Sequence, residues 1–191
     1  MTNLHDMTAG ELLAHYKSRK LSPVEVVDAV IAHIGRWEPT IKALYAPDFG
    51  GARKAAQESE KRWQAGRPQG ALDGVPITIK ENIATRGVPV PLGTAATDLV
   101  PAAEDAPAAA RVREAGAIIL SKTTMPDYGM LSSGRSSFHP LTRNPWNPAW
   151  NPGGSSAGAG AAAAAGYGPL HLGTDIGGSV RLPACWNGIF T

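Results

Sequence analysis

The chain has 191 residues, of which 43% are hydrophobic and 18% are charged, and its formal net charge is +2. This composition is typical of one soluble globular domain, and the small net charge gives no support to a nucleic-acid partner. The single cysteine, Cys185, excludes an internal disulfide framework, and the five scattered histidines lack metal-ligand spacing, so we expect no metal and no cofactor.

Residues 1–70 predict a helical lead-in without evident chemistry. Thr8 and Glu11 have the spacing of a capping box, and so do Ser22 and Glu25, with proline at the first helical position after Ser22. A third helix, charged on its outer face, is expected from about residue 52 to 65. Apolar residues recur at helical spacing after the second box, at Val26, Val27, Val30, Ile31 and Ile34.

Residues 71–191 change to shorter, alternating elements. The run 77–80 is β-rich and ends in Lys80; "AAARVREAG" predicts a helix that stops at Gly116, and an apolar strand follows over 117–121. "GPLHLGT" predicts a third short strand. Alternation of strands and helices with short connections predicts an α/β fold with helices packed on a sheet.

Two serines precede a segment of very small residues. After the Pro-rich loop "TRNPWNPAWNP", the stretch "GGSSAGAGAAAAAGYG" predicts a buried helix over 157–165, because alanine is the best helix former. Ser155 and Ser156 then lie at its N-terminus, where one hydroxyl is enough for capping. The alternative is low-complexity filler, which would be richer in polar residues.

A third serine, Ser179, follows the glycine-rich run of "LGTDIGGSVRLPA". Such a run lets several backbone N–H groups turn toward one point, and a hydroxyl beside them is what acyl transfer needs. The simpler alternative is a tight turn with a capping serine. Residues 154–158 also match the sequence pattern of a nucleophile elbow, and residues 158–163 match a relaxed dinucleotide-binding fingerprint. Both motifs require a β-strand immediately before them, and the preceding segment is rich in proline instead.

In combination, "GVPITIKENI", "NPGGSSAGAG" and "LGTDIGGSVRLPA" resemble the amidase signature family, from about residue 74 to 188. The resemblance implies a mixed sheet core with helices packed on both faces, here incomplete because members usually run to more than twice this length. Residues 1–191 would then be the N-terminal part of an amidase signature domain, with 1–70 as lead-in and 71–191 as the core that carries the signature.

The resemblance also implies roles. Ser179 would be the nucleophile, Ser155 the bridging serine after a cis peptide bond, and Lys80 the base. Lysine can act so only when neutral, which requires burial to lower its pKa by roughly three units from 10.4. The oxyanion hole falls on the backbone N–H groups of Ile176, Gly177, Gly178 and Ser179. Structural support is expected from Asp175 and Arg181, and Ser132 and Ser133 match a stretch that lines the acyl pocket in relatives.

The expected activity is hydrolysis of a small-molecule carboxamide to carboxylate and ammonia through a Ser179 acyl-enzyme. The amidase-like subunit of a tRNA-dependent amidotransferase and a non-catalytic fragment stay open as alternatives. We expect no direct nucleic-acid contact and no membrane segment, and the protein would be cytoplasmic because no signal peptide is recognisable. A homodimer, or a chain supplying the C-terminal half, would complete the fold.

Overall fold

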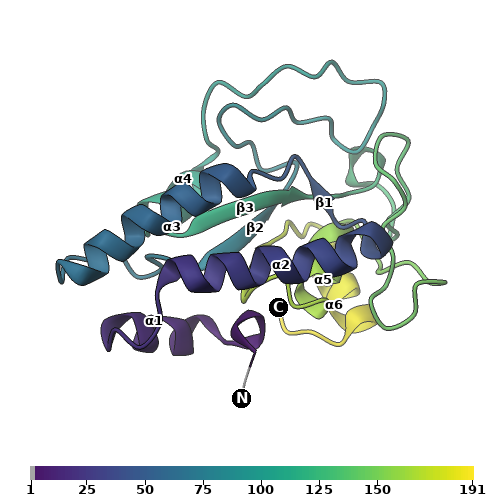
Figure 1. Cartoon of the computed structure of the whole chain (residues 1–191). Coiled ribbons are helices and arrows are strands. Elements are labelled where there is room, and N and C mark those ends of the chain that lie inside the picture. Colours follow the sequence, from purple (N-terminus) through teal and green to yellow (C-terminus); the bar gives the residue numbers. More distant parts are fainter. Residues whose placement is uncertain (1–2) are drawn as a thin grey trace.

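The computed structural model describes residues 3–191 and contains a four-stranded sheet surrounded by helices (Figure 1). In chain order the elements are η1 (Leu4–Asp6), α1 (Ala9–Lys17), α2 (Pro23–Ile41), β1 (Leu44–Tyr45), α3 (Phe49–Gln64), β2 (Pro76–Lys80), α4 (Pro107–Glu114), β3 (Ile118–Thr123), η2 (Asp127–Gly129), α5 (Ala157–Ala164), β4 (Leu170–Leu172) and α6 (Arg181–Asn187). No helix within residues 3–191 is long and apolar enough to span a bilayer.

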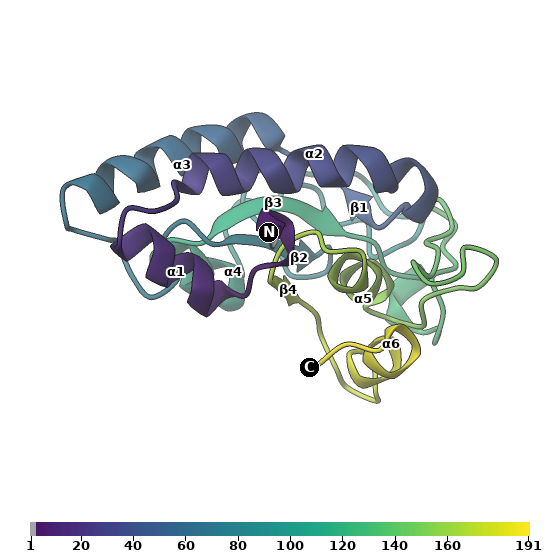
Figure 2. The same cartoon turned by 60° about the horizontal axis from the view of Figure 1, so that its bottom comes forward.

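The sheet is mixed, with strand order β1-β3-β2-β4. β2 pairs in parallel with β3 and with β4, whereas the two-residue β1 pairs antiparallel with β3. α2 and α3 cover one face, as Figure 2 shows, and α4 lies on the other. The expected α/β architecture, a mixed sheet with helices on both faces, is therefore confirmed.

Both predicted capping boxes are present, on α1 and α2. Other boundaries differ from expectation. α3 begins at Phe49 because the Asp48 side chain accepts from the Gly51 N–H and caps the helix. β3 continues past Ser121 to Thr123 and so includes Lys122, whose charge masked the end of the apolar run. No element was predicted at β1 or at α6.

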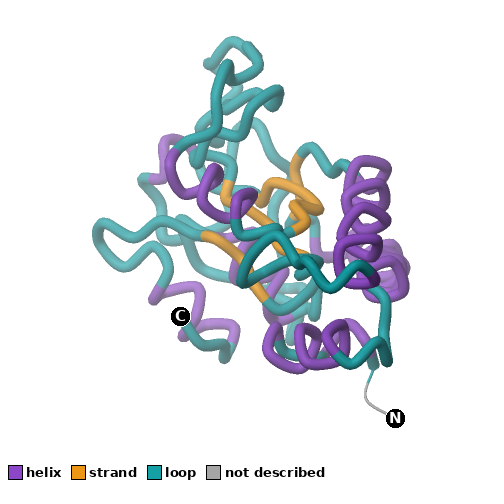
Figure 3. Tube along the Cα trace, turned by 90° about the vertical axis from the view of Figure 1, so that its left-hand side faces the viewer, coloured by secondary structure: helices purple, strands orange, loops and turns teal. Residues whose placement is uncertain are grey.

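Helix α5 is buried against the sheet, as its small residues predict. A Cβ atom at Gly158 would lie 2.3 Å from the Ala43 carbonyl oxygen and 2.4 Å from the Thr124 nitrogen, so only glycine permits this approach. The close packing brings the N-terminus of α5, with its two serines, against the carboxyl ends of the parallel strands. Long loops precede α4 and α5, and Figure 3 shows in teal how much of the chain is loop.

Candidate active site

Lys80 is the last residue of β2, and its side chain is completely buried. Its Nζ donates to Ser155 Oγ at 2.8 Å and to Thr174 Oγ1 at 2.9 Å. Burial lowers the pKa of Lys80 to about 8, although the charges of Glu81 and Asp175 act in the opposite direction. A pKa near 8 makes the neutral form of this lysine far more accessible near pH 7 than it is for a lysine in water.

The two serines at the start of α5 have different contacts. The peptide bond between Gly154 and Ser155 is cis, and Ser155 directs its hydroxyl to Lys80. Ser156 instead binds the segment that leads to Ser179. Its N–H donates to the Ser179 carbonyl at 3.0 Å, and its hydroxyl donates to the Thr174 carbonyl at 3.2 Å. Ser156 thus anchors that segment, and of the two serines it is Ser155 that contacts the lysine.

The turn before Ser179 is organised by the carboxylate of Asp175. It accepts backbone N–H groups from Gly178 at 2.7 Å and Val180 at 3.0 Å, and it pairs with two nitrogens of the Arg181 guanidinium at 2.9 and 3.0 Å. The Arg181 guanidinium, together with these N–H groups, holds the pKa of Asp175 well below its usual range. Asp175 and Arg181 together therefore fix the shape of the turn.

The same contacts bear on the predicted oxyanion hole, because one of its four N–H groups already has an acceptor in the protein. The Gly178 N–H is used by Asp175 and is not free for a substrate oxygen. The N–H groups of Ile176, Gly177 and Ser179 have no acceptor among residues 3–191. These three residues also line a hollow beside Lys80 and Ser155, so three of the four predicted donors keep that role as candidates.

This hollow has a volume of 330 Å³ and brings together segments far apart in the sequence. It is lined by Asn82, Met125, Tyr128, Gly129, Met130, Leu131, Ser132, Ser155, Thr174, Ile176, Gly177, Ser179 and Leu182. Of the two serines predicted to line the acyl pocket, Ser132 lies at the hollow and Ser133 does not. The backbone of Ser133 packs against Gly154, where an added Cβ would come within 2.6 Å of it.

Two lining residues were not singled out from the sequence. Thr174 Oγ1 accepts from Lys80 Nζ and also from Asn82 Nδ2, the latter at 3.2 Å. Asn82 stands two positions after Lys80 in "IKENI", and Thr174 directly precedes Asp175. Their proximity to Lys80 and to the glycine turn was a usable signal, but a single polar residue beside a motif does not reveal its partner.

A second buried polar cluster, around Glu81 and Lys122, was not predicted from the sequence either. Glu81 is fully buried, and its carboxylate accepts from the Gly93 N–H and contacts His139 Nε2. Lys122 donates to the Ile83 carbonyl and to Thr85 Oγ1, and burial lowers its pKa to about 8. None of these groups lines the hollow that contains Ser179.

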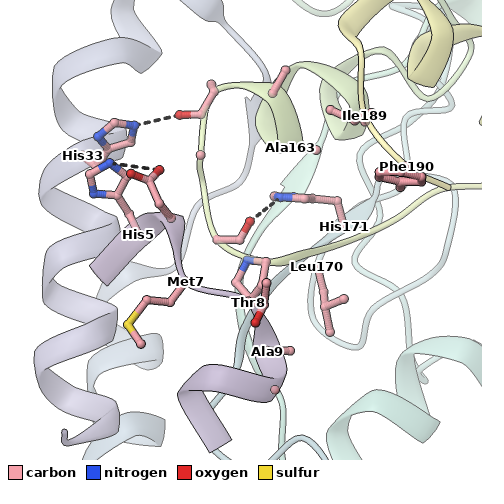
Figure 4. Close-up of a pocket in the computed structure, with 17 residues that line it drawn as sticks. His5, Met7, Thr8, Ala9, His33, Ala163, Leu170, His171, Ile189 and Phe190 are labelled. Carbon is pink, nitrogen blue, oxygen red and sulfur yellow. Dashed lines mark hydrogen bonds and ion pairs between the residues drawn. The ribbon is translucent and has the colours of Figure 1, made fainter. Parts of the chain in front are cut away.

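A hollow of 740 Å³ lies elsewhere, between the N-terminal residues, α5 and β4 (Figure 4). It contains His5, His33 and His171 but none of the three predicted catalytic residues. The ring nitrogens of His171 contact Thr78 Oγ1 at 2.8 Å and the Gly168 carbonyl at 2.9 Å. Burial lowers its pKa to about 4, so His171 is a neutral, fully bonded side chain.

No histidine in the described part of the chain hydrogen-bonds to Ser155 or Ser179. Across residues 3–191 there is also no grouping of three His, Cys, Asp or Glu side chains that could hold a metal ion. The titratable group that contacts Ser155 is therefore Lys80, and no side-chain hydrogen bond of Ser179 is present within residues 3–191.

Comparison with known proteins identifies the family. The sequence model described as Amidase matches residues 25–190. The chain belongs to the amidase signature family. A glutamyl-tRNA(Gln) amidotransferase subunit from Chloroflexus aurantiacus is similar to this amidase signature chain, with 40% identity over 189 residues. Those residues are 99% of this chain and 39% of that protein.

Two further relatives of this amidase signature protein show the same partial overlap. An indoleacetamide hydrolase from Bradyrhizobium diazoefficiens is 39% identical over 184 residues, which are 96% of this chain and 35% of that protein. A solved structure of fatty acid amide hydrolase has a TM-score of 0.91 at 27% identity, covering 95% of this chain and 32% of that one. The chain therefore spans less than two fifths of the length of these relatives.

Proposed function

We propose that this chain carries the catalytic residues of an amide hydrolase. The observation that supports this best is the buried 2.8 Å hydrogen bond from Lys80 Nζ to Ser155 Oγ, at the edge of a hollow that Ser179 also lines. A serine hydroxyl needs a base to become a nucleophile, and a lysine with a pKa near 8 can be that base.

In the proposed acylation step, neutral Lys80 takes the proton of Ser155, and Ser155 takes the proton of Ser179. The Ser179 oxygen attacks the carbonyl carbon, and the developing oxyanion accepts hydrogen bonds from the N–H groups of Ile176, Gly177 and Ser179. The C–N bond then breaks as Ser155 donates its proton to the leaving nitrogen and is reprotonated by the Lys80 ammonium. Ammonia departs, and the acyl group stays on Ser179.

Deacylation repeats the relay with water. Water attacks the ester carbonyl and transfers its proton through Ser155 to Lys80, and the proton returns to the Ser179 oxygen as the carboxylic acid leaves. Ser132, exposed at the rim of the hollow, would contact the acyl group. Asp175 and Arg181 take no proton in this scheme, because they hold the turn that carries the oxyanion donors.

The proposal extends to the rest of the protein. Residues 1–191 would be the N-terminal part of an amidase signature domain, with 1–70 as helical lead-in and 71–191 as the core. The substrate would be a small-molecule amide, the compartment the cytoplasm, and the remaining strands and pocket walls would come from a further length of chain or from a second copy. The partial coverage of longer relatives supports this part.

A second candidate function is that of the amidase-like component of a tRNA-dependent amidotransferase. Support comes from the 40% identity to the glutamyl-tRNA(Gln) amidotransferase protein, which the 39% identity to the indoleacetamide hydrolase equals in weight. The candidate site is common to both functions. Glutamine-dependent ammonia release that requires added partner proteins would favour the amidotransferase, whereas release from simple aliphatic or aryl amides by the chain alone would favour the hydrolase.

The test of the proposed function is covalent labelling with a fluorophosphonate probe. Wild-type protein should be labelled on Ser179, Ser179→Ala should lose labelling and ammonia release, and Ser18→Ala, a matched change at an exposed serine, should keep both. Labelling that survives in Ser179→Ala would contradict the assignment, and a wild-type chain that never reacts would indicate a non-catalytic fragment.

A further inference from the structure

Asn82 lies at the junction of the candidate proton relay and the hollow. It follows the end of β2 by two residues, and its Nδ2 donates to Thr174 Oγ1 at 3.2 Å. The same Thr174 oxygen accepts from Lys80 Nζ at 2.9 Å, and Asn82 lines the hollow together with Ser155 and Ser179. Asn82 and Lys80 thus share one hydrogen-bond acceptor, the hydroxyl of Thr174.

The other end of that carboxamide has no partner. Asn82 Oδ1 is buried and meets no hydrogen-bond donor among residues 3–191. A buried acceptor without a donor costs a folded protein free energy, and a native structure rarely keeps one without a reason. Asn82 lines the hollow while its Oδ1 is shielded from it, so a turn of the carboxamide as substrate binds would bring this unpartnered acceptor to a donor on the substrate.

The chemistry of the leaving group identifies that donor. The leaving nitrogen must receive its proton from Ser155, so it lies on the side of Ser179 where Ser155, Lys80 and Thr174 meet. Asn82 is joined to this side through Thr174. An amide nitrogen carries N–H donors, whereas the leaving oxygen of an ester carries none.

We propose that Asn82 is a specificity-determining residue whose Oδ1 accepts a hydrogen bond from the N–H of the leaving nitrogen, so that the site favours amides over esters. This rests on the proposed function and adds to it. The contact moves no proton, because its role is to orient the leaving nitrogen toward Ser155. An ester has no N–H at that position and cannot make the contact.

The experiment compares kcat/KM for an aryl amide and an aryl ester that share the same acyl and aryl groups, in wild type and Asn82→Leu. Leucine has a similar volume but offers neither the acceptor nor the donor that binds Thr174, and the ester and labelling rates report the loss of that second contact. We expect the amide value to fall about 10- to 100-fold while the ester value stays within about threefold. Asn3→Leu, at an exposed asparagine, is the matched control and should change neither value.

Fluorophosphonate labelling of Ser179 is measured in the same samples, because the probe has no leaving N–H and should react with wild type and Asn82→Leu at equal rates. An unchanged amide-to-ester ratio with labelling intact would overturn the role of Asn82 alone. Equal losses of amide turnover, ester turnover and labelling in the variant would show a structural role instead. A wild-type protein that is not labelled on Ser179 would overturn both proposals.

Discussion

The two buried lysines of this protein are both shielded from solvent and differ in what they contact. Lys80 on β2 and Lys122 on β3 are each at most 2% exposed, and burial lowers the pKa of both to about 8. In the register of the sheet Lys122 pairs with Ile79 and Lys80 with Thr123, so the two side chains leave opposite faces.

Lys80 donates to two hydroxyl groups in the wall of the hollow that holds Ser179, and one of them belongs to Ser155. Lys122 donates to the Ile83 carbonyl and to Thr85, which closes the loop after β2. A lowered pKa therefore does not by itself mark a catalytic group in this fold. The contacts of the amine separate a candidate base from a structural cation.

The largest expected effect is on catalysis. Replacing Lys80 with methionine removes the base and should lower the rate of Ser179 labelling and of amide turnover by about 10²- to 10⁴-fold. Lys122→Met removes an amine with the same pKa but without contact to the serines, and its rates should stay within about tenfold of wild type. Equal losses of labelling and turnover in the two variants, measured at one pH on folded protein, would contradict the assignment of Lys80 as the base and Lys122 as a structural cation.

A second effect is on stability. Lys80 has a folded pKa near 8 and an unfolded pKa near 10.5, so between these values the unfolded chain binds the extra proton. Stability of the wild type should therefore rise with pH from about 8 to 10.5. Lys80→Met lacks this penalty and should be more stable by about 1–3 kcal/mol at pH 7, with the difference vanishing near pH 11.

Urea denaturation across this pH range measures the difference. Lys80→Arg is the counterpart, because a guanidinium keeps its charge in the buried site and should destabilise the protein at every pH in the range. A Lys80→Met protein that is less stable than wild type at pH 7 would show that the hydrogen bonds of the amine outweigh its burial.

The smallest effect concerns Glu81, whose charge acts on both lysines and raises the pKa of each. Glu81→Gln keeps the shape of the side chain and removes the charge, so the pKa of Lys80 and the pKa of Lys122 should each fall. NMR titration of ¹³C-labelled lysine side chains reports both groups without requiring activity, and Lys80→Met assigns the signals.

Glu104→Gln is the matched control, because Glu104 is exposed and its loss should leave both titrations in place. Unchanged lysine titrations in Glu81→Gln would show that the carboxylate does not act on the amines. A change in the pKa of Lys122 alone would show that the Glu81 carboxylate does not act on Lys80.

Much of this arrangement could be predicted from the sequence, and the gaps have physical causes. The capping boxes, the small-residue helix and the resemblance around Lys80 and Ser155 led to the fold and to the contact between those two side chains. The resemblance implied four N–H donors, but Asp175 engages Gly178, and such a side-chain contact depends on the path of the turn. Lys122 was missed because a charge after an apolar run is typical of the end of a strand.

Thr174 and Asn82 were missed for a similar reason. Their importance depends on the pairing of β2 with β4, which brings residues 92 positions apart within 3.2 Å of each other. Local patterns do not contain that distance. Only the tertiary structure explains why two serines stand at the start of α5. The Ser156 side chain binds the backbone of the segment that leads to Ser179 instead of capping α5.

The central claim, that contact with Ser155 makes Lys80 the base, is tested most directly by the pH dependence of the fluorophosphonate labelling rate in wild type and Lys122→Met. We predict a rate that rises with pH, with a midpoint near 8 in both proteins, because only the titration of Lys80 limits the reaction. A midpoint near 6.5, typical of a histidine base, or a midpoint that disappears in Lys122→Met, would contradict the account.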